Sequence, residues 1–424
     1  SYSAFFLALA PLGLHIHLPN YYFEIKKWKL YWNHIFFLFL CSGIICSGLY
    51  IGFLLIELSY VSFYKRLLIG VFSCTPILLF STNTVSGQLY PLLSRPLPLV
   101  LRNLIASLFS IIVVFIVIVV FKLGYWGWIF GSFTSAVISF FLFSHVLKRR
   151  EGIYPVKELK INRIQEWIKI AFPVIPHAIG FMLLNSSSRI IMNFYNVPLE
   201  DIGIFSNGYM MGDYITIVAI SVSTALQPQI QTAYREKRLN DYKKLYYLCQ
   251  ITACISVFLI SCWMPNIYSI LIKNENLQVA APIASLTCYA NVMMPFYQFM
   301  AFTVFITKQT KQLLWLVFFP GIINVVLCLV FIPVYGYWAA VYSTLIAFWS
   351  QLLVPIVSKF HKKEVRQWLG SKRKLLYLFG ILIVLITISN MVSKIPLFMK
   401  IIVTLLSLAS VGVLYIKNKN TLPI

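Results

Sequence analysis

Long apolar runs, separated by short groups of charged and turn residues, recur along the whole chain. A helix needs about 20 mostly apolar residues to cross the hydrocarbon core of a bilayer. No stretch shows the period-two alternation that is typical of outer-membrane strands. The pattern therefore predicts thirteen membrane-spanning helices, at 1–23, 31–56, 67–90, 99–121, 125–147, 168–195, 203–230, 245–265, 279–307, 312–333, 337–358, 375–392 and 395–416.

The composition agrees with this pattern. Of the 424 residues, 60% are hydrophobic and only 11% are charged, whereas soluble domains carry roughly 25% charged residues. An ordinary soluble enzyme is therefore excluded. The net charge of +23 would suggest a nucleic-acid partner in a soluble protein, so the position of the basic residues along the chain decides its meaning.

The basic residues alternate between loops. By the predicted spans, 28 Lys and Arg residues fall in every second loop and in the tail, and five fall in the other loops. Basic loops stay in the cytoplasm, so the C-terminus is predicted to be cytoplasmic and the charge is an orientation signal, with no nucleic-acid partner. Because the first span would then begin outside, we expect one further helix before Ser1.

A short internal repeat indicates two lobes. Gly124-Tyr125-Trp126 matches Gly336-Tyr337-Trp338 at an offset of 212 residues, and an apolar helix and a basic loop follow both. We therefore predict an all-α polytopic membrane protein with two six-helix lobes, the first helix missing from this sequence, and two extra C-terminal helices. The expected domains are 1–150 (helices 2–6), 151–363 (helices 7–12) and 364–424 (helices 13 and 14). Such repeats are typical of transporters that bind substrate near the bilayer midplane.

Two ionisable residues, Arg189 and Asp213, lie well inside the predicted spans. A charge near the bilayer centre costs about 2.5–3.5 kcal/mol on insertion scales, so it should face a partner or a cavity. Three interpretations remain open. The first is a buried Arg189–Asp213 ion pair. The second is an Arg189 that binds an anionic lipid head group, while Asp213 serves as its partner or as a proton or cation coupling site. The third is an Arg189 whose side chain extends to the lipid interface. Lys400 lies near a span end, where its amine can reach the interface.

The span that carries Arg189 holds further polar residues. Asn185 and Ser188 are candidates, with Arg189, for a substrate-binding cavity. His177 could titrate as a coupling residue, although a hydrogen-bonded structural histidine is the alternative. No P-loop, HExxH or GxSxG motif occurs. We therefore expect neither an enzyme nor a metal site nor a bound cofactor, and a proton or sodium gradient as the energy source.

Three segments around these residues carry a family resemblance. They are Phe172-Pro-Val-Ile-Pro-His, Asn185-Ser-Ser-Ser-Arg-Ile-Ile-Met and Val197-Pro-Leu-Glu-Asp-Ile-Gly-Ile-Phe-Ser-Asn-Gly-Tyr, and Gln227-Pro228 also fits. In this region the chain resembles polysaccharide flippases of the O-antigen, capsule or exopolysaccharide type, within the multidrug/oligosaccharidyl-lipid/polysaccharide exporter superfamily. It departs from their pattern at Ser188, where the family often has an acid.

The resemblance implies a V-shaped, alternating-access transporter in the bacterial inner membrane. Its substrate would be an undecaprenyl-pyrophosphate-linked glycan for lipopolysaccharide or exopolysaccharide assembly, with Arg189 at the pyrophosphate. A polysaccharide polymerase and chain-length proteins would be its partners, together with the lipid bilayer. The alternatives are a cation-coupled drug antiporter of the same superfamily and, less favoured, a membrane polysaccharide polymerase.

Overall fold

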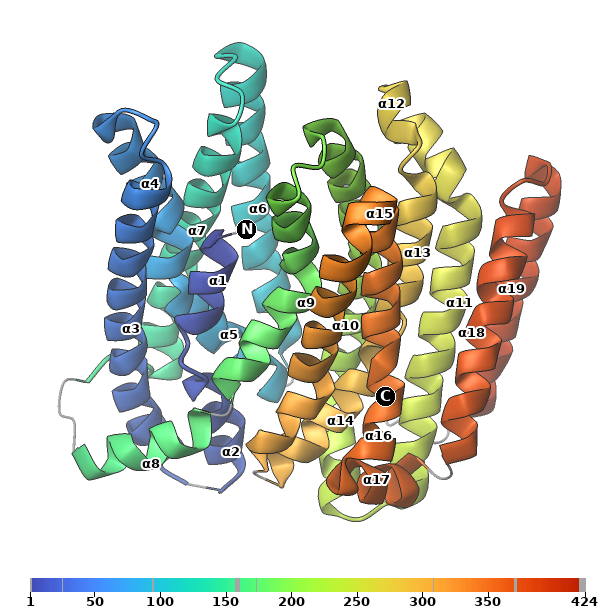
Figure 1. The fold of residues 1–424 in the computed structure, drawn as a ribbon. Helices are drawn as coiled ribbons and strands as arrows, with labels where there is room; N and C mark the ends of the chain where they lie inside the picture. Colours follow the sequence, from blue (N-terminus) through green and yellow to red (C-terminus); the bar gives the residue numbers. More distant parts are fainter. Residues whose placement is uncertain are drawn as a thin grey trace. The chain divides into compact units, whose positions relative to one another are not determined.

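The computed structural model describes residues 2–24, 26–93, 95–156, 161–172, 174–307, 309–369 and 372–418, and these ranges contain helices and no strands (Figure 1). The helices are α1 (Tyr2–Leu9), α2 (His17–Glu24), α3 (Trp28–Glu57), α4 (Phe63–Leu78), α5 (Phe80–Leu92), α6 (Pro96–Phe115), α7 (Trp126–Val146), α8 (Ile161–Ala171), α9 (Val174–Phe194), α10 (Leu199–Arg235), α11 (Leu239–Leu271), α12 (Glu275–Gln278), α13 (Ala281–Asn291), α14 (Met294–Ile306), α15 (Phe319–Trp349), α16 (Val354–Val357), α17 (Lys359–Glu364), α18 (Lys372–Val392) and α19 (Leu397–Asn418). Short 3₁₀ and π turns lie between them: η1 (Leu14–Ile16), η2 (Ile116–Val120), η3 (Leu147–Glu151), η4 (Thr310–Gln312), η5 (Leu314–Phe318), η6 (Ser350–Leu353) and η7 (Val365–Leu369).

Within the described residues, seven helical segments are long and apolar enough to cross a membrane. They contain eight of the predicted spans, because the segment Thr310–Val357 holds two of them. Two shorter apolar helices, Gly380–Val392 and Leu397–Ala409, lie in the last two predicted spans. Helices satisfy every backbone polar group internally, as the interior of a bilayer requires. The prediction of an all-α polytopic membrane protein is confirmed.

Several predicted spans are interrupted rather than continuous in the described residues. The span 1–23 breaks between α1 and η1, where Leu12 and Gly13 both have positive φ. A Cβ at Gly13 would collide with the Ala171 carbonyl and with Val174, so this break lies directly against the junction of α8 and α9. The spans 67–90 and 279–307 each divide into two helices, α4 with α5 and α13 with α14.

The internal repeat has a conformational counterpart. Gly124, between η2 and α7, has a φ of 55°. Gly336, which breaks the helical geometry inside α15, has a φ of 57°. Glycine adopts this left-handed conformation without steric cost, and the two glycines are separated by the predicted offset of 212 residues.

The chain divides into two compact units, residues 1–179 and 180–424. The predicted lobe boundary after residue 150 lies earlier than this division. The difference arises because the segment after α7 is bound to the first unit: the Asn33 side chain accepts a hydrogen bond from the Tyr154 amide at 3.2 Å and donates one to the Gly152 carbonyl at 3.4 Å. The amphipathic helix α8 packs against η1, and His17 Nε2 lies 3.1 Å from the Trp167 carbonyl oxygen.

These contacts also place basic segments at one end of the first unit. Asn33 lies near the start of α3, just after Lys26, Lys27 and Lys29, and Gly152 directly follows Lys148, Arg149 and Arg150. Two loops that were predicted to share a membrane face therefore lie together. The assignment of that face to the cytoplasm stays a prediction.

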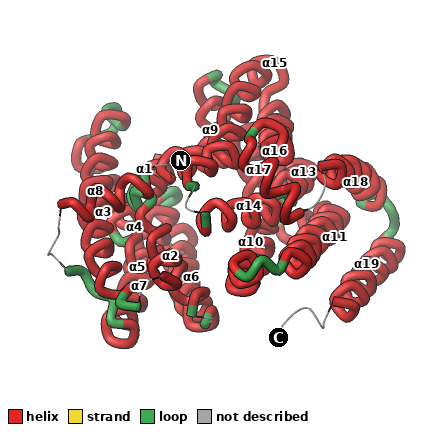
Figure 2. Tube along the Cα trace, turned by 90° about the horizontal axis from the view of Figure 1, so that it is seen from below, coloured by secondary structure: helices red, strands yellow, loops and turns green. Residues whose placement is uncertain are grey.

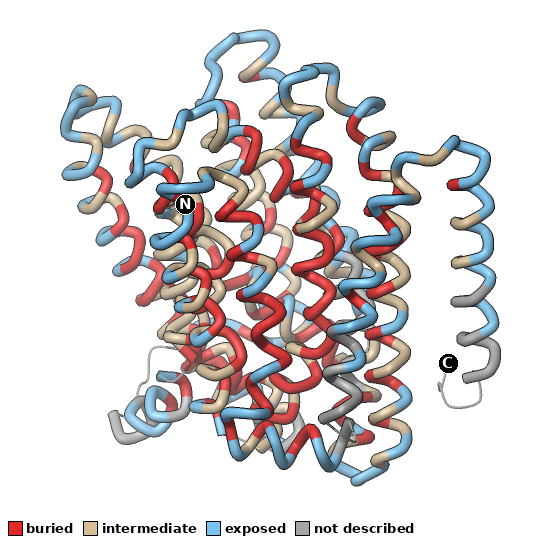
Figure 3. Tube along the Cα trace, turned by 45° about the vertical axis from the view of Figure 1, so that its right-hand side comes forward, coloured by how far each residue is buried: buried red, intermediate tan, exposed pale blue. Residues whose placement is uncertain are grey.

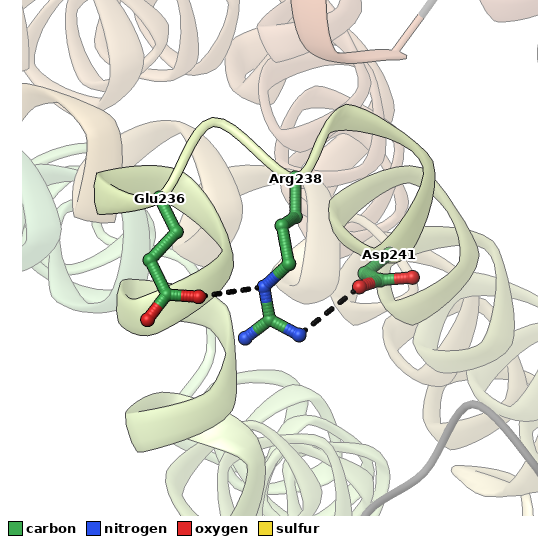
Figure 4. A network of polar contacts seen from close by, with 3 residues as sticks. All are labelled: Glu236, Arg238 and Asp241. Carbon is green, nitrogen blue, oxygen red and sulfur yellow. Dashed lines mark hydrogen bonds and ion pairs between the residues drawn. The ribbon is translucent and has the colours of Figure 1, made fainter.

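The second unit shows the same arrangement at the end of α10. The Tyr234 hydroxyl donates to Glu364 Oε2 at 3.2 Å, which brings the basic segments after α10 and after α16 to one end. At this end Ser358 caps α17 by accepting from the His361 amide, and burial lowers the pKa of His361 to about 4. In the turn between α10 and α11, Arg238 forms ion pairs with Glu236 at 2.8 Å and Asp241 at 3.2 Å (Figure 4).

Inside the second unit, α10, α11, α13 and α14 pack closely, and α18 and α19 lie against α11, as the view along the helices shows (Figure 2). Gly208 and Gly212 permit the approach of α10 to α13, because a Cβ at either would collide with α13 or the residue before it. The last helix, α19, exposes most of its apolar side chains (Figure 3). The helix pair predicted at the C-terminus thus belongs to the second unit.

Candidate functional site

The polar run on α9 divides between two faces of the helix. Ser187 and Ser188 are buried and contact α15, whereas Asn185 and Arg189 are half-buried and contact α10. Successive residues of a helix point about 100° apart, so neighbours in sequence need not share a surface. The four polar residues therefore form parts of two different clusters, both within the second unit.

The α15 side of this run is a neutral cluster centred on Asn324, which is fully buried. Its amide nitrogen donates to Ser187 Oγ at 3.2 Å, to Ser188 Oγ at 3.4 Å and to two backbone carbonyls of α9. Its amide oxygen accepts from Thr344 Oγ1 at 3.5 Å. Ser188 also lies 3.5 Å from Cys328 Sγ. Every polar side chain here has a partner, so this cluster joins α9 to α15 as an internal contact.

The α10 side of the run contains the cation. Arg189 Nε donates to Ser206 Oγ at 3.1 Å, and Nη1 donates to the Asn185 carbonyl at 3.3 Å. The guanidinium carbon lies 4.9 Å from the centre of the Tyr209 ring and 5.9 Å from that of Phe205. A guanidinium has five N–H donors, so these two bonds leave donor capacity on the outer edge of the group.

The Tyr209 ring packs against the face of the Arg189 guanidinium and holds it in position. Its hydroxyl donates to Asn185 Oδ1 at 2.6 Å, and the residue is 5% exposed. The ring therefore cannot leave the face of Arg189 without breaking a hydrogen bond between α9 and α10. A cation on an aromatic face gains about 0.5–2 kcal/mol, and this contact holds Arg189 without neutralising its charge.

The partners of Asp213 are neutral side chains, which differ from the Arg189 partner that the ion-pair interpretation required. Its Oδ1 accepts from Thr216 Oγ1 and from Asn291 Nδ2, both at 3.0 Å. Arg189 and Asp213, which both lie in the described ranges, form no ion pair shorter than 4.0 Å with each other. The predicted buried ion pair is therefore wrong, because Ser206 and the Tyr209 ring occupy the near surface of Arg189 and neutral donors occupy Asp213.

His177 is 7% exposed and lies in the first turn of α9, which belongs to the first unit. It is close enough to His15 for an electrostatic interaction. At 1.5 Å per residue, twelve residues of helix separate it from Arg189 by about 18 Å. The structure thus does not bring His177 into the cluster around Arg189.

Lys400 is bound within the protein. It is only 5% exposed, and its amine donates to Asn266 Oδ1 at 2.6 Å where α19 packs on α11. Its position at the membrane interface stays a prediction. One helical turn further along, the Thr404 hydroxyl accepts from Trp263 Nε1 at 2.9 Å, so two polar contacts attach α19.

Sequence reasoning identified Asp213 but did not single out Ser206 and Tyr209 of α10 or Asn291 of α13, which complete the site. Ser206, Tyr209 and Asp213 follow one another at spacings of three and four, which places them on one face of α10. That spacing was a usable signal. The choice of Asn291 over the other polar residues of its span had no sequence signal. The side chain of Gln227, part of the resemblance, lies outside the described residues.

The described helices form a helical membrane protein, and comparisons with known proteins show which proteins share its fold. The profile of the family described as "Polysaccharide biosynthesis protein" matches residues 24–234. No match was found among the curated proteins.

Solved structures share the fold. The lipid II flippase MurJ in its inward closed conformation has a TM-score of 0.64 at 15% identity, over 99% of this chain and 93% of that one. The eukaryotic MATE transporter AtDTX14 has a TM-score of 0.62 at 13% identity, over 88% and 87%. An outward-facing multidrug resistance MATE family transporter of the MOP superfamily has a TM-score of 0.59 at 12% identity, over 86% and 85%.

The profile match and the shared fold confirm the resemblance, inferred from the sequence, to polysaccharide flippases of the multidrug/oligosaccharidyl-lipid/polysaccharide exporter superfamily. At these identities the structural likeness concerns the fold alone. The residues that contact a substrate must therefore be argued from this chain.

Proposed function

We propose that this protein is a flippase for undecaprenyl-pyrophosphate-linked oligosaccharides, which it moves across the bacterial inner membrane for assembly of surface polysaccharides such as O-antigen, lipopolysaccharide or exopolysaccharide. It acts as a transporter rather than an enzyme. Its profile match to a polysaccharide biosynthesis family and its fold similarity to a lipid II flippase support this substrate class. A polysaccharide polymerase and chain-length proteins are the partners that would take over the translocated units.

The observation that carries the proposal is the state of Arg189. It is a guanidinium within a predicted span, on an aromatic support, and no carboxylate of the described residues lies within ion-pair distance of it. An unneutralised cation is costly in a membrane and marks a substrate path by default. The planar guanidinium matches the paired oxygens of a phosphate, so we assign Arg189 to the pyrophosphate.

Asn185 and Ser188 contribute differently to this proposal. Asn185 lies beside Arg189, and its carbonyl and amide oxygen orient the guanidinium and the Tyr209 ring. Ser188 is 3% exposed and bonded within the α15 cluster. We propose Asn185 as a positioning residue and Ser188 as a support for α9.

Deletion of the gene tests the function. We expect lipid-linked repeat units to accumulate on the cytoplasmic face while their synthesis continues, and surface glycan to disappear. Complementation with wild type should restore the glycan, Arg189→Ala should not, and Arg66→Ala is the matched control, because Arg66 bonds to the Leu55 carbonyl in the other unit. Normal surface glycan in the deletion strain would refute the proposal.

A cation-coupled drug antiporter is the second candidate, and Asp213 is the observation that favours it. Asp213 is an acid without a basic partner within 4.0 Å in the described part of the chain, and such an acid could attract a cationic drug. Efflux assays with cationic dyes separate the two candidates. Drug resistance that depends on Asp213, with unchanged surface glycan, would select the antiporter.

A further inference from the structure

We propose that Arg102 of α6 is the centre of a binding site for the head group of an anionic phospholipid, at the end of the first unit that carries the basic segments. The site uses residues of α5, α6 and α7, and it belongs to a different unit from Arg189. Binding of a resident membrane lipid goes beyond the proposed transport of a lipid-linked glycan, and it needs no transported substrate.

The described partners of Arg102 are neutral groups. Its Nη1 donates to the Tyr90 hydroxyl of α5 at 3.1 Å and to the Pro98 carbonyl, one turn earlier in α6, at 3.2 Å. The guanidinium carbon lies 5.5 Å from the centre of the Tyr90 ring and 5.8 Å from that of Phe143 on α7. No carboxylate of the described residues lies within 4.0 Å of the guanidinium. Three helices thus position this cation and leave it charged.

One edge of the guanidinium is available to a ligand. Both hydrogen bonds start from Nη1, so Nε and Nη2 donate to no described residue. The side chain is half-buried, and neither nitrogen is a buried atom without a partner, so this edge is open to the surface. The N–H bonds of Nε and Nη2 run parallel, which lets them donate to two oxygens of one phosphate. An anion with paired oxygens is therefore the ligand that fits.

The contacts of Arg102 parallel those of Arg189. Each guanidinium donates to a hydroxyl and to the backbone carbonyl four residues earlier, and each lies on two aromatic rings. What marks Arg102 is the exposure of its helix. Only 11% of the most apolar stretch of the segment Pro96–Val120 is buried, the lowest share among the seven described segments. In a membrane this helix is covered mainly by lipid, so lipid head groups are the phosphates that Arg102 meets.

The surface beside Arg102 is apolar and selects a lipid over a free anion. Ile105 and Phe109 lie three and seven residues after Arg102, on the same side of α6, and both are exposed. An acyl chain can follow these side chains while the phosphate binds the guanidinium. A free inorganic anion would gain nothing from this apolar surface.

Further basic residues at the same end add to the positive field. Arg95 directly precedes α6, is exposed, and donates its amide to the Tyr90 carbonyl at 3.0 Å. The exposed basic run 148–150 begins five residues after Phe143, about 8 Å along the helix axis, and Glu151 is the acid that follows it. Charges at such separations lie within about one Debye length at physiological salt. Basic pockets between membrane helices bind anionic lipid head groups.

Native mass spectrometry of the purified full chain, released from detergent with added lipid, tests the proposal. We expect wild type to bind phosphatidylglycerol about tenfold more tightly than phosphatidylcholine, and Arg102→Ala to lose this preference. Arg102→Lys keeps the charge without the paired donors and should retain part of it. Arg66→Ala is the matched control, because Arg66 also lies on an aromatic ring in the first unit, 5.9 Å from the centre of Phe63, and it should bind like wild type.

The melting temperature in lipid-free detergent checks that each variant is folded. If Arg102→Ala does not fold, Arg102→Lys decides the question, since it keeps a cation beside Tyr90 and Phe143. A wild-type preference for phosphatidylglycerol in that variant would then overturn the role of the paired donors.

Three further results would overturn the proposal. The first is the same preference for phosphatidylglycerol in wild type and in folded Arg102→Ala. The second is displacement of the lipid by inorganic phosphate, which would identify a site for a free anion. The third is displacement by undecaprenyl pyrophosphate that depends on Arg102, which would assign this arginine to the transported lipid. The gene-deletion phenotype depends on none of these results, so failure of the lipid site and failure of the proposed flippase are distinguishable.

Discussion

The two faces of α9 place polar side chains inside the protein in different ways. On the α15 face, Ser187, Ser188 and Asn324 bring only neutral groups into the interior and bond them to one another. On the α10 face, Arg189 brings a full charge and leaves it without a counterion in the described residues. Ser188 and Arg189 are adjacent in sequence.

The α15 face of α9 thus contributes to stability, and the α10 face contributes to the proposed function. A satisfied neutral network stabilises a helix contact and offers nothing to a ligand. A supported cation with unused donors contributes little to packing and can bind an anion. The role of a polar residue in a span, stabilising the fold or binding a ligand, therefore follows from its partners and not from its position in a polar run.

The largest effect is expected at the cation. Arg189→Ala should lower the initial rate of transport of a lipid-linked pyrophosphate in proteoliposomes by roughly 100-fold, taking about 1.5–3 kcal/mol for hydrogen bonds to a charged group. The melting temperature should change little. Arg189→Lys should recover part of the rate, because it keeps the charge and loses the planar fork. A wild-type rate in folded Arg189→Ala would remove the distinction between the two faces.

The centre of the neutral cluster should show the reverse pattern. Asn324→Leu removes bonds from Asn324 to α9, and interhelical hydrogen bonds in membrane proteins average about 0.6 kcal/mol, so we expect a loss of about 1–2 kcal/mol. Thermal unfolding in detergent measures it. Transport per folded molecule should remain near wild type, and a selective loss of transport would place this face on the substrate path.

Ser188→Ala tests the difference between the two faces of α9 at a single position. It removes one hydroxyl from the neutral cluster, and we expect a stability loss of about 0.6 kcal/mol without a change in transport. Unfolding and transport are compared in the same preparation. Strong loss of transport at normal stability would restore Ser188 to the substrate cavity, where its sequence position first placed it.

The smallest effect is expected at Lys400, which is buried beside α11. Lys400→Met should change stability by no more than about 0.5 kcal/mol, because the lost bond to Asn266 is offset by removal of a buried charge. Transport should be unchanged. Unfolding and transport assays check both, and a transport defect would show that Arg189 is not unique in its role.

The sequence predicted the helical architecture well, because apolar runs of sufficient length have few other solutions. It also located the repeat, since Gly124 and Gly336 share a backbone conformation that few other residues adopt. It missed the break at Gly13, because the signal depends on Ala171 and Val174, which approach from far along the chain.

At the candidate site the sequence identified Arg189 and Asp213 but not their partners. The expected ion pair relied on opposite charges at similar depth, whereas Tyr209 and Asn291 decided the contacts by the way α9, α10 and α13 pack. Helical spacing could have indicated Tyr209. Pairing across helices depends on rotation about each axis, which one sequence does not specify.

The bond between Lys400 and Asn266 has a consequence for the assembly of the protein during synthesis. The chain emerges from its N-terminus, so α11 is complete long before α19. An amine on a lone inserting helix can remain at the water interface, but in the finished protein it is enclosed beside Asn266. The last helix must therefore dock on an α11 that is already in place, and this docking is a late step in biogenesis.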